Sequence, residues 1–217
     1  MEILQRSRLP RTSFAGVREH RLVTDSRQFG EQTSQSWNGL ADFVYLADAR
    51  LVPGGETGMH AHQDIDVITL MVEGALEHRG SLQDKSTLAS GQVLVQRSGG
   101  DGFSHNEINP AEAENRLIQI WVLPANKSGP ATSHSQLLES GGITRVYGGD
   151  SETTLVDIAT LKAEQSIDIN VPFIGYVCRG KGFANEDMVD EGDLLRAEQL
   201  TFDATSDVQL IIIHQAR

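Results

Sequence analysis

The chain has 217 residues, of which 39% are hydrophobic, 22% charged and 6% aromatic, enough apolar material for one large domain or two small fused ones. This balance excludes collagen and coiled coils and argues against disorder. Thirty Asp and Glu residues against eighteen Lys and Arg residues give a net charge of -12. Such a charge repels phosphate backbones and anionic lipid head groups, so we expect neither direct nucleic-acid binding nor membrane binding.

The amino-terminal residues give no clear targeting pattern. Four arginines lie between positions 6 and 18, but no apolar core follows them and Pro10 interrupts any amphipathic helix. We interpret residues 1–20 as an edge segment, and no apolar run approaches the roughly 20 residues of a membrane-spanning helix. The single cysteine, Cys178, cannot close an intramolecular disulfide, and we predict that it is a small buried residue. We therefore expect a soluble, cytoplasmic protein.

Period-2 hydrophobic patterns punctuated by glycine pairs predict a mainly β protein, a sandwich or a barrel. Two strands, 64–72 and 117–123, are apolar on both faces, which is typical of central strands covered on both sides. A polar, glycine-containing stretch, 125–150, then predicts a crossover to a second group of strands in residues 151–217. The expected strands are 43–50, 64–72, 92–96, 117–123, 167–171, 175–178 and 208–214.

Two residue pairs with i, i+2 spacing indicate a metal site. In a strand, residues i and i+2 point to the same face, so His60 and His62 can reach one point in space. An isolated pair favours solvated or hydrogen-bonded histidines over a metal site, but a second pair, His105 and Glu107, follows at a distance suited to return to the same sheet. Three imidazoles and one carboxylate suit Fe(II), Mn(II), Ni(II), Cu(II) or Zn(II), and a six-coordinate ion would keep two open positions for chemistry.

The residues around these pairs resemble the cupin motif and, within the cupins, the pirin family. The first half of the motif is Gly54-x5-His60-x-His62-x3-Asp66, and the second runs from Gly91 to His105-x3-Asn109. Segments 60–66, 72–74 with His78, 102–109 and 119–121 with Pro124 are similar to pirins. The resemblance is close over residues 40–124, a little over a third of the chain.

The pirin resemblance implies an all-β bicupin, two face-to-face β-barrels in one chain. It implies a metal-binding barrel at 1–124, a crossover at 125–150, and a second barrel at 151–217 that has lost its ligands. The family's metal ligands correspond to His60, His62, His105 and Glu107, usually with iron. Asp66 stands where pirins usually have Glu, so we expect an altered pocket shape, and the family's Phe- and Tyr-rich amino-terminal run is not recognisable in residues 1–40.

Other polar and large residues near the motif have less specific interpretations. We interpret His78 as a turn or surface residue, and Gln119 either as a polar group pointing into the barrel or as an ordinary strand residue. Asp64 and Asp66 are expected either to orient a ligand imidazole or to bond the backbone. Four further residues are interpreted as core rather than as cofactor contacts, with Met59 the one to check for lining a cavity: Trp37, Met59, Met71 and Trp121.

The leading functional hypothesis is a metal-dependent dioxygenase, because the resemblance implies cleavage of a flavonol such as quercetin with dioxygen. Fe(II) is the expected ion, and Glu107 is the expected base for the substrate hydroxyl as well as the fourth ligand. An animal pirin is an iron-dependent transcriptional co-regulator, so the rival hypothesis is a non-enzymatic, metal- or redox-responsive regulator that binds a protein partner. A third hypothesis is an isomerase or sugar-binding cupin with another metal.

Overall fold

A computed structural model describes residues 1–31, 35–149 and 152–216. Within these residues, helix is confined to the short segments η1 (Arg6–Arg8) and α1 (Ser26–Phe29), and the named strands form four sheets. No helix in the described ranges has the length and apolar character that crossing a lipid bilayer requires. The predicted all-β class is confirmed.

The first half of the molecule contains a seven-stranded and a four-stranded sheet. In order of hydrogen-bonded neighbours, the larger sheet consists of β12 (Thr132–Leu137), β9 (Gln92–Arg97), β6 (Asp66–Glu73), β11 (Arg116–Val122), β4 (Phe43–Leu51), β3 (Val17–Thr24) and β2 (Arg11–Phe14). The smaller sheet consists of β5 (His60–His62), β10 (Phe103–Ile108), β7 (Ala75–Gly80) and β8 (Gln83–Ala89).

The second half repeats this plan with a six-stranded and a four-stranded sheet. The larger sheet consists of β1 (Glu2–Gln5), β19 (Asp193–Ala197), β16 (Phe173–Arg179), β21 (Val208–Gln215), β14 (Thr154–Leu161) and β13 (Gly142–Tyr147). The smaller sheet consists of β15 (Ser166–Ile169), β20 (Leu200–Ala204), β17 (Lys181–Ala184) and β18 (Asp187–Asp190).

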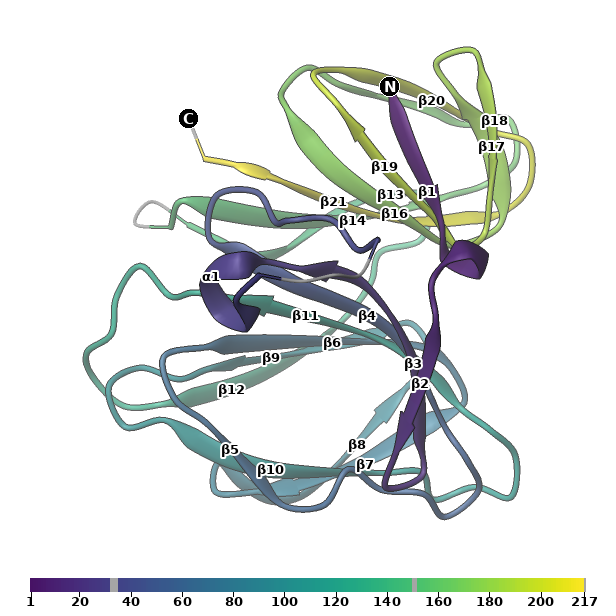
Figure 1. Cartoon of the computed structure of the whole chain (residues 1–217). Coiled ribbons are helices and arrows are strands. Elements are labelled where there is room, and N and C mark those ends of the chain that lie inside the picture. Colours follow the sequence, from purple (N-terminus) through teal and green to yellow (C-terminus); the bar gives the residue numbers. More distant parts are fainter. Residues whose placement is uncertain (32–34, 150–151, 217) are drawn as a thin grey trace.

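The two large sheets face each other across the middle of the molecule, and the small sheets lie outside, so each half is a barrel and the predicted bicupin is confirmed (Figure 1). One core cluster fills the space between the halves, with Ile68 and Ile120 from the first half against Ile158 and Ile211 from the second. A second cluster fills the second barrel. Two smaller clusters share the first barrel, which leaves room there for polar side chains.

Strict alternation along the central strands separates these cores. On β6, Ile68 and Leu70 join the core between the halves, whereas Thr69 points into the first barrel, where it bonds Glu107. On β11, Ile120 joins the same core, whereas Gln119 points into the barrel and also bonds Glu107. The polar residues of these apolar strands therefore mark the inner wall of one barrel.

The expected strands are confirmed with small shifts at their ends. Strand 64–72 begins two residues late, at Asp66, because Asp64 has a φ of 58°, a left-handed conformation that ends strand geometry. The central positions of β6 and β11 are confirmed, and Cys178 is buried.

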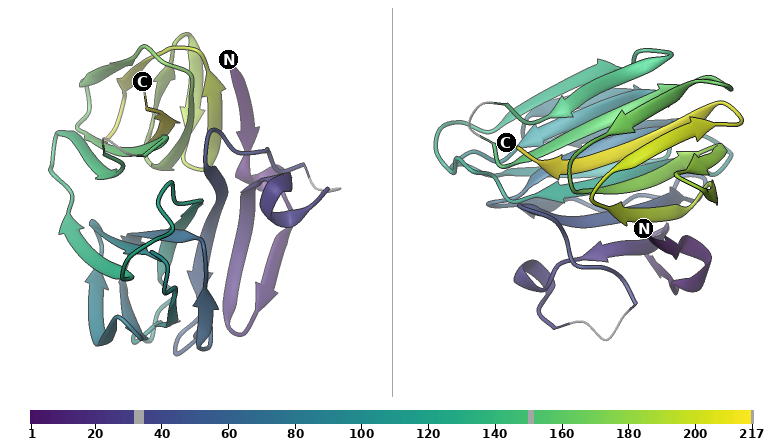
Figure 2. Two further views of the ribbon diagram at one scale, coloured as in Figure 1. Left: turned by 90° about the vertical axis from the view of Figure 1, so that its left-hand side faces the viewer. Right: turned by 90° about the horizontal axis from the view of Figure 1, so that it is seen from above.

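The amino-terminal segment runs along one side of both halves (Figure 2). β1 pairs with β19 at the edge of the second half's large sheet, whereas β2 and β3 lie at the edge of the first half's large sheet. Within stretch 125–150, β12 pairs with β9 and β13 pairs with β14, so this stretch contributes a strand to each half. The predicted boundary at residues 150 and 151 lies outside the described residues, and the domain limits stay a prediction.

Candidate metal centre

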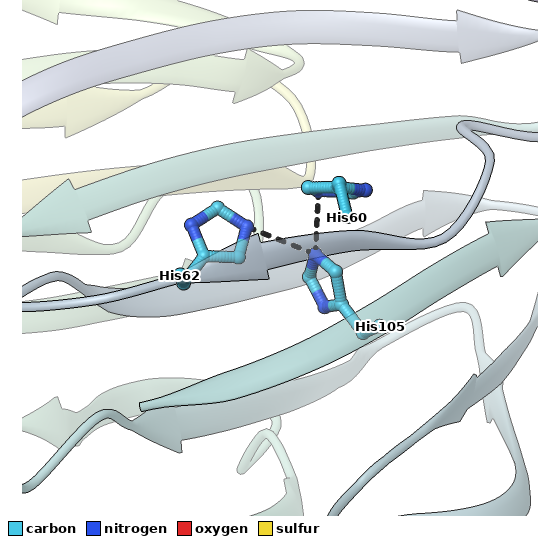
Figure 3. A group of neighbouring side chains, drawn as sticks. All are labelled: His60, His62 and His105. Carbon is cyan, nitrogen blue, oxygen red and sulfur yellow. Dashed lines mark hydrogen bonds between the residues drawn. The ribbon is translucent and has the colours of Figure 1, made fainter. Parts of the chain in front are cut away.

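Three histidine side chains converge inside the first barrel (Figure 3). β5 and β10 are antiparallel neighbours, with His105 opposite His60 and Phe103 opposite His62. The Nε2 atom of His105 lies 2.9 Å from Nε2 of His60 and 3.1 Å from Nε2 of His62. The ligand atoms of all three lie within 4.8 Å of one another. The i, i+2 spacing therefore brings the predicted histidines to one centre.

The spacing of these nitrogens fits a metal ion. With metal–nitrogen bonds of about 2.1 Å, adjacent nitrogens of a six-coordinate ion lie about 3.0 Å apart, and those of a tetrahedral ion about 3.4 Å apart. The two separations from His105, 2.9 and 3.1 Å, are short enough for these nitrogens to share one ion.

The outer nitrogens of two rings fix which nitrogen carries the proton. Nδ1 of His60 lies 2.9 Å from the carbonyl oxygen of Gly58, and Nδ1 of His105 lies 2.8 Å from Oε1 of Gln96. Since these oxygens only accept hydrogen bonds, each Nδ1 donates its proton and each Nε2 keeps a lone pair. Two lone pairs aimed at each other repel, whereas a cation between them is bound, so the donor set fits a metal.

Burial keeps two of these imidazoles neutral. Burial, together with the neighbouring imidazole of His60, lowers the pKa of His62 to about 4. Deeper burial and the positive charges that neighbouring histidines would carry lower the pKa of His105 to about 2. Neutral imidazole is the form that binds metal ions, so both rings are ready to act as ligands at pH 7.

Glu107 lies on the same face of β10 as His105 but outside the group of converging ligand atoms. Its carboxylate is 1% exposed and accepts hydrogen bonds from Oγ1 of Thr69 (3.2 Å) and Nε2 of Gln119 (3.0 Å). Burial raises the pKa of Glu107 to about 7, against the opposing effect of these hydrogen bonds. Its predicted role as fourth ligand stays a prediction.

A cavity of about 270 Å³ opens beside His60 and Glu107. Trp121 forms one wall, with its ring 4.4 Å from that of Tyr45 and 6.0 Å from that of Phe29. Nε1 of Trp121 donates to Oε1 of Gln119, which fixes the amide so that its NH2 group faces Glu107. The residues lining the cavity are Phe14, Glu19, Arg21, Tyr45, Thr57, His60, Glu107, Gln119 and Trp121.

Comparison with known proteins places the chain in a family. The family model Pirin matches residues 23–122. A protein of Zymomonas mobilis, provisionally named quercetin 2,3-dioxygenase, is 33% identical over 192 residues, which cover 76% of this chain and 79% of that protein. This chain belongs to the pirin family.

Other relatives extend the comparison. The quercetin 2,3-dioxygenase of Escherichia coli is 30% identical over 97 residues, which cover 44% of this chain and 42% of that protein. The solved structure of a bacterial pirin from Escherichia coli in complex with nickel(II) superposes with a TM-score of 0.84 over 98% of this chain and 97% of that one, at 16% identity. This likeness supports the bicupin fold.

The interpretation of His78 as a turn or surface residue is wrong. β7 resumes directly after Gly74, and alternation places His78 on the inner face with Leu76, where it is 2% exposed. Its Nε2 atom lies 2.9 Å from Nδ1 of His105. Gln96 was missed entirely, although it follows Leu94 on the inner face of β9. The period-2 pattern could have identified both residues.

The remaining interpretations have mixed outcomes. Gln119 points into the barrel, and Trp121, interpreted as core, packs against a core cluster but also lines the cavity. Met71 is buried and Trp37 packs against the core, as expected, but Met59 is 60% exposed and belongs neither to the core nor to the cavity lining.

Asp66 bonds neither an imidazole nor the cavity lining. Its carboxylate accepts hydrogen bonds from the backbone N–H of Ser98 (2.8 Å) and from the hydroxyl of Tyr147 (2.8 Å) in the second half. The shorter side chain therefore serves the contact between the halves. Asp66 is absent from the residues that line the cavity, and the effect of its shorter side chain on the shape of the pocket stays a prediction.

Proposed function

We propose that this pirin is an Fe(II)-dependent dioxygenase whose substrate is a small planar aromatic compound with a free hydroxyl group, such as a flavonol. In this proposal His60, His62 and His105 hold the ion, and Glu107 is the fourth ligand. The observation that carries the proposal is the convergence of three Nε2 atoms beside a cavity with an aromatic wall. Supporting evidence comes from the name of the Escherichia coli relative, quercetin 2,3-dioxygenase.

The residues of the cavity suit this chemistry. A bound divalent ion supplies a Lewis acid and a path for electrons to dioxygen. Trp121 offers an aromatic surface for a planar ring. The volume of about 270 Å³ lies just below the usual range of about 300–1,000 Å³ for small-molecule sites, which favours one compact molecule over a polymer.

Glu107 is the residue we propose to take the proton of the substrate hydroxyl. Within the set of lining residues, Glu19 is the other carboxylate, and it already accepts hydrogen bonds from Arg21 (2.6 Å) and Tyr45 (3.0 Å). The carboxylate of Glu107 accepts hydrogen bonds from the neutral groups of Thr69 and Gln119 and pairs with no Arg or Lys side chain among the described residues. We propose that it takes the proton after it leaves or loosens its bond to the ion. Gln119 would hold the carboxylate toward the substrate.

Oxygen uptake tests the proposal. Protein purified without added metal is loaded anaerobically with Fe(II), and dioxygen and flavonol are followed together after mixing. We expect one dioxygen consumed per flavonol cleaved. Metal-free protein and His60→Ala are expected to be inactive, whereas a matched control at an exposed histidine, His134→Ala, is expected to be fully active.

The same experiment distinguishes the enzyme from the rival hypothesis of a non-enzymatic, metal-responsive regulator. Stoichiometric metal binding without dioxygen uptake, across a panel of flavonols and smaller phenols, would contradict the enzyme and favour a metal-responsive regulator. Loading with Mn(II), Ni(II), Cu(II) and Zn(II) in parallel tests the ion. Turnover with another ion that exceeds the Fe(II) rate tenfold would replace Fe(II) in the proposal.

A further inference from the structure

Two buried polar side chains lie behind His105, on the side away from the converging Nε2 atoms. His78 comes from β7 and Gln96 from β9, and they are 2% and 1% exposed. Three atoms form a closed triangle: Nδ1 of His105 lies 2.8 Å from Oε1 of Gln96 and 2.9 Å from Nε2 of His78, and the last two atoms are 3.0 Å apart.

Counting protons gives a consistent arrangement of this triangle. The amide oxygen of Gln96 accepts the proton on Nδ1 of His105. Nε2 of His78 either donates its own proton to the same oxygen or presents a lone pair to the Nδ1 proton of His105, and both arrangements leave that proton on Nδ1. In the opposite tautomer of His105, a lone pair on Nδ1 would face the lone pairs of the Gln96 oxygen. The proton would then lie on Nε2, where it would point toward His60 and His62. The Gln96 oxygen therefore selects the tautomer of His105 that presents a lone pair to the metal centre.

Packing needs alone do not explain these two residues. The inner-face neighbours of His78 on β7 and of Gln96 on β9 are Leu76 and Leu94, both members of an apolar cluster. Burying a polar side chain costs free energy unless its groups are hydrogen-bonded, so apolar residues would fill the same space at lower cost. The position of the Gln96 oxygen against a histidine of the metal centre indicates a role in holding that ring.

We propose that Gln96 and His78 are positioning residues that fix the tautomer and ring orientation of His105, and thereby set the affinity and reduction potential of the bound ion. Neither residue lines the cavity, so both act through His105. His78 supports the Gln96 oxygen, and the edge-on packing of its ring, 72° from that of His105 with centroids 4.9 Å apart, limits rotation of the ligand ring. This inference rests on the proposed metal centre, but not on the proposed reaction.

Co(II) binding to the full chain tests the pair, with the dissociation constant and the visible ligand-field spectrum as readouts. Gln96→Leu removes the acceptor, and His78→Phe removes its support while keeping a ring. Loss of an outer partner of a metal-bound histidine lowers metal affinity by about 10–100-fold, and we expect both variants to fall in this range with altered spectra. Gln209→Leu, at a buried glutamine on β21 in the second half, is the matched control and should bind as the parent does.

A conservative variant distinguishes positioning from packing. Gln96→Glu keeps an oxygen at the same place, so we expect Co(II) binding within about threefold of the parent. Its negative charge makes His105 a stronger donor, which lowers the Fe(III)/Fe(II) reduction potential. If Gln96→Leu does not fold, the reduction potential of Gln96→Glu tests the proposal instead. A potential equal to that of the parent overturns the proposal.

Two outcomes separate this inference from the metal centre itself. A folded Gln96→Leu or His78→Phe variant that binds Co(II) within threefold of the parent, with the parent's spectrum, overturns the positioning role. A parent protein that does not bind Co(II) contradicts the metal centre on which the inference depends.

Discussion

Side-chain alternation along β10 gives the site its chemistry at the level of single residues. Phe103, His105 and Glu107 all point into the barrel, so a ring, a metal-binding nitrogen and a carboxylate follow one another on one face. Changes at Glu107 can distinguish metal binding from catalysis, because the ligand atoms of the three histidines converge without its carboxylate.

Replacing Glu107 with Gln is predicted to keep the fold and the metal stoichiometry but to lower the turnover number by about 10²–10⁴-fold, the usual contribution of a general base. The amide retains the shape of the side chain but cannot take a proton. Steady-state oxygen uptake and elemental analysis measure the two effects. Glu112→Gln, at an exposed position, is the control, and full turnover by Glu107→Gln would remove Glu107 from the mechanism.

The sequence predicted His60 and His62 because their spacing matches the strand period, and His105 because it begins a second pair with the same spacing. The convergence of His105 with the other two depends on the register of β5 and β10. Glu107 was predicted as a ligand from the same rule, but its hydrogen bonds to Thr69 and Gln119 come from β6 and β11 and need the sheet register. The contact between His78 and Gln96 joins residues 18 apart on two different strands, so it too depends on tertiary structure.

At the level of elements, the turn before β10 sets the approach of the two histidine strands. Gly102 has a φ of +69°, and a Cβ there would lie 2.8 Å from the carbonyl oxygen of His62. Only glycine combines this left-handed backbone with so close a neighbour. The pairing of β10 with β5 therefore depends on a residue that has no side chain.

Gly102→Ala is predicted to lower the free energy of unfolding by about 1–3 kcal/mol, the cost of a strained left-handed residue. Because the clash would push His62 away from His105, Co(II) affinity should fall as well. Denaturant unfolding and Co(II) titration measure these effects. In Gly142→Ala a new Cβ meets nothing nearer than 3.9 Å, so this control should change neither, and parent-like behaviour of Gly102→Ala would contradict the account.

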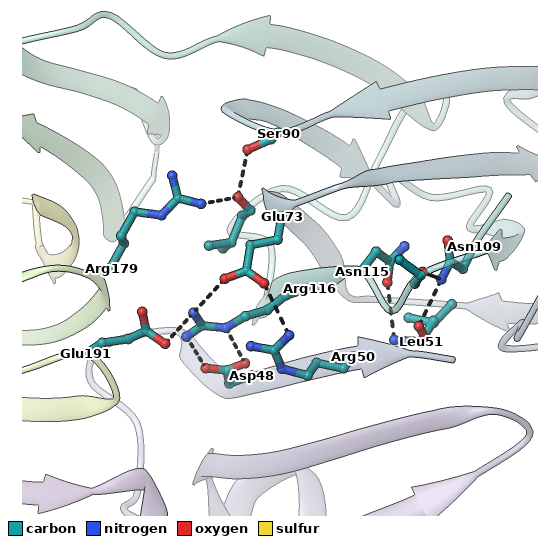
Figure 4. A network of polar contacts seen from close by, with 12 residues as sticks. Asp48, Arg50, Leu51, Glu73, Ser90, Asn109, Asn115, Arg116, Arg179 and Glu191 are labelled. Atoms are coloured by element: carbon teal, nitrogen blue, oxygen red, sulfur yellow. Dashed lines mark hydrogen bonds and ion pairs between the residues drawn. The ribbon is translucent and has the colours of Figure 1, made fainter. Parts of the chain in front are cut away.

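At the scale of the whole molecule, an ion-pair network joins the two barrels (Figure 4). Arg116 on β11 is fully buried, and its guanidinium group bonds Asp48 on β4 (2.6 and 3.0 Å) and Glu191 in the second half (2.7 Å). Arg6, from the segment that runs along both halves, also pairs with Asp48. The sequence did not predict this network, because Asp48 and Arg116 meet through the register of β4 and β11, and only the stacking of the two barrels brings Glu191 to them.

The charge of Asp48 is predicted to stabilise the stacked halves in a pH-dependent way. Burial alone raises the pKa of Asp48, but hydrogen bonds and charges from Arg116 and Arg6 outweigh it and lower the pKa below its usual value. A carboxyl with a lowered pKa stabilises the folded state above its unfolded pKa of about 3.9, and this contribution is lost as the pH falls through the folded pKa.

Asp48→Asn is therefore predicted to lower the free energy of unfolding by about 3–5 kcal/mol at pH 7, because it leaves Arg116 buried without its main partner. The gap between parent and variant should begin to narrow as the pH falls below about 3.9, where the carboxyl of the unfolded parent takes up a proton, and should keep narrowing down to the lowered pKa of the folded state. Urea unfolding at several pH values measures both. The exposed Arg18–Glu114 pair provides the control, since Glu114→Gln should cost less than about 1 kcal/mol, and a gap that stays constant with pH would contradict this role of Asp48.

The central claim is that His60, His62 and His105 bind one metal ion inside the first barrel, and anomalous diffraction from a Co(II)-loaded crystal tests it most directly. We predict one peak within about 2.0–2.2 Å of all three Nε2 atoms. Crystals that contain stoichiometric Co(II) with no peak between these nitrogens, or with the ion held elsewhere, would contradict the account.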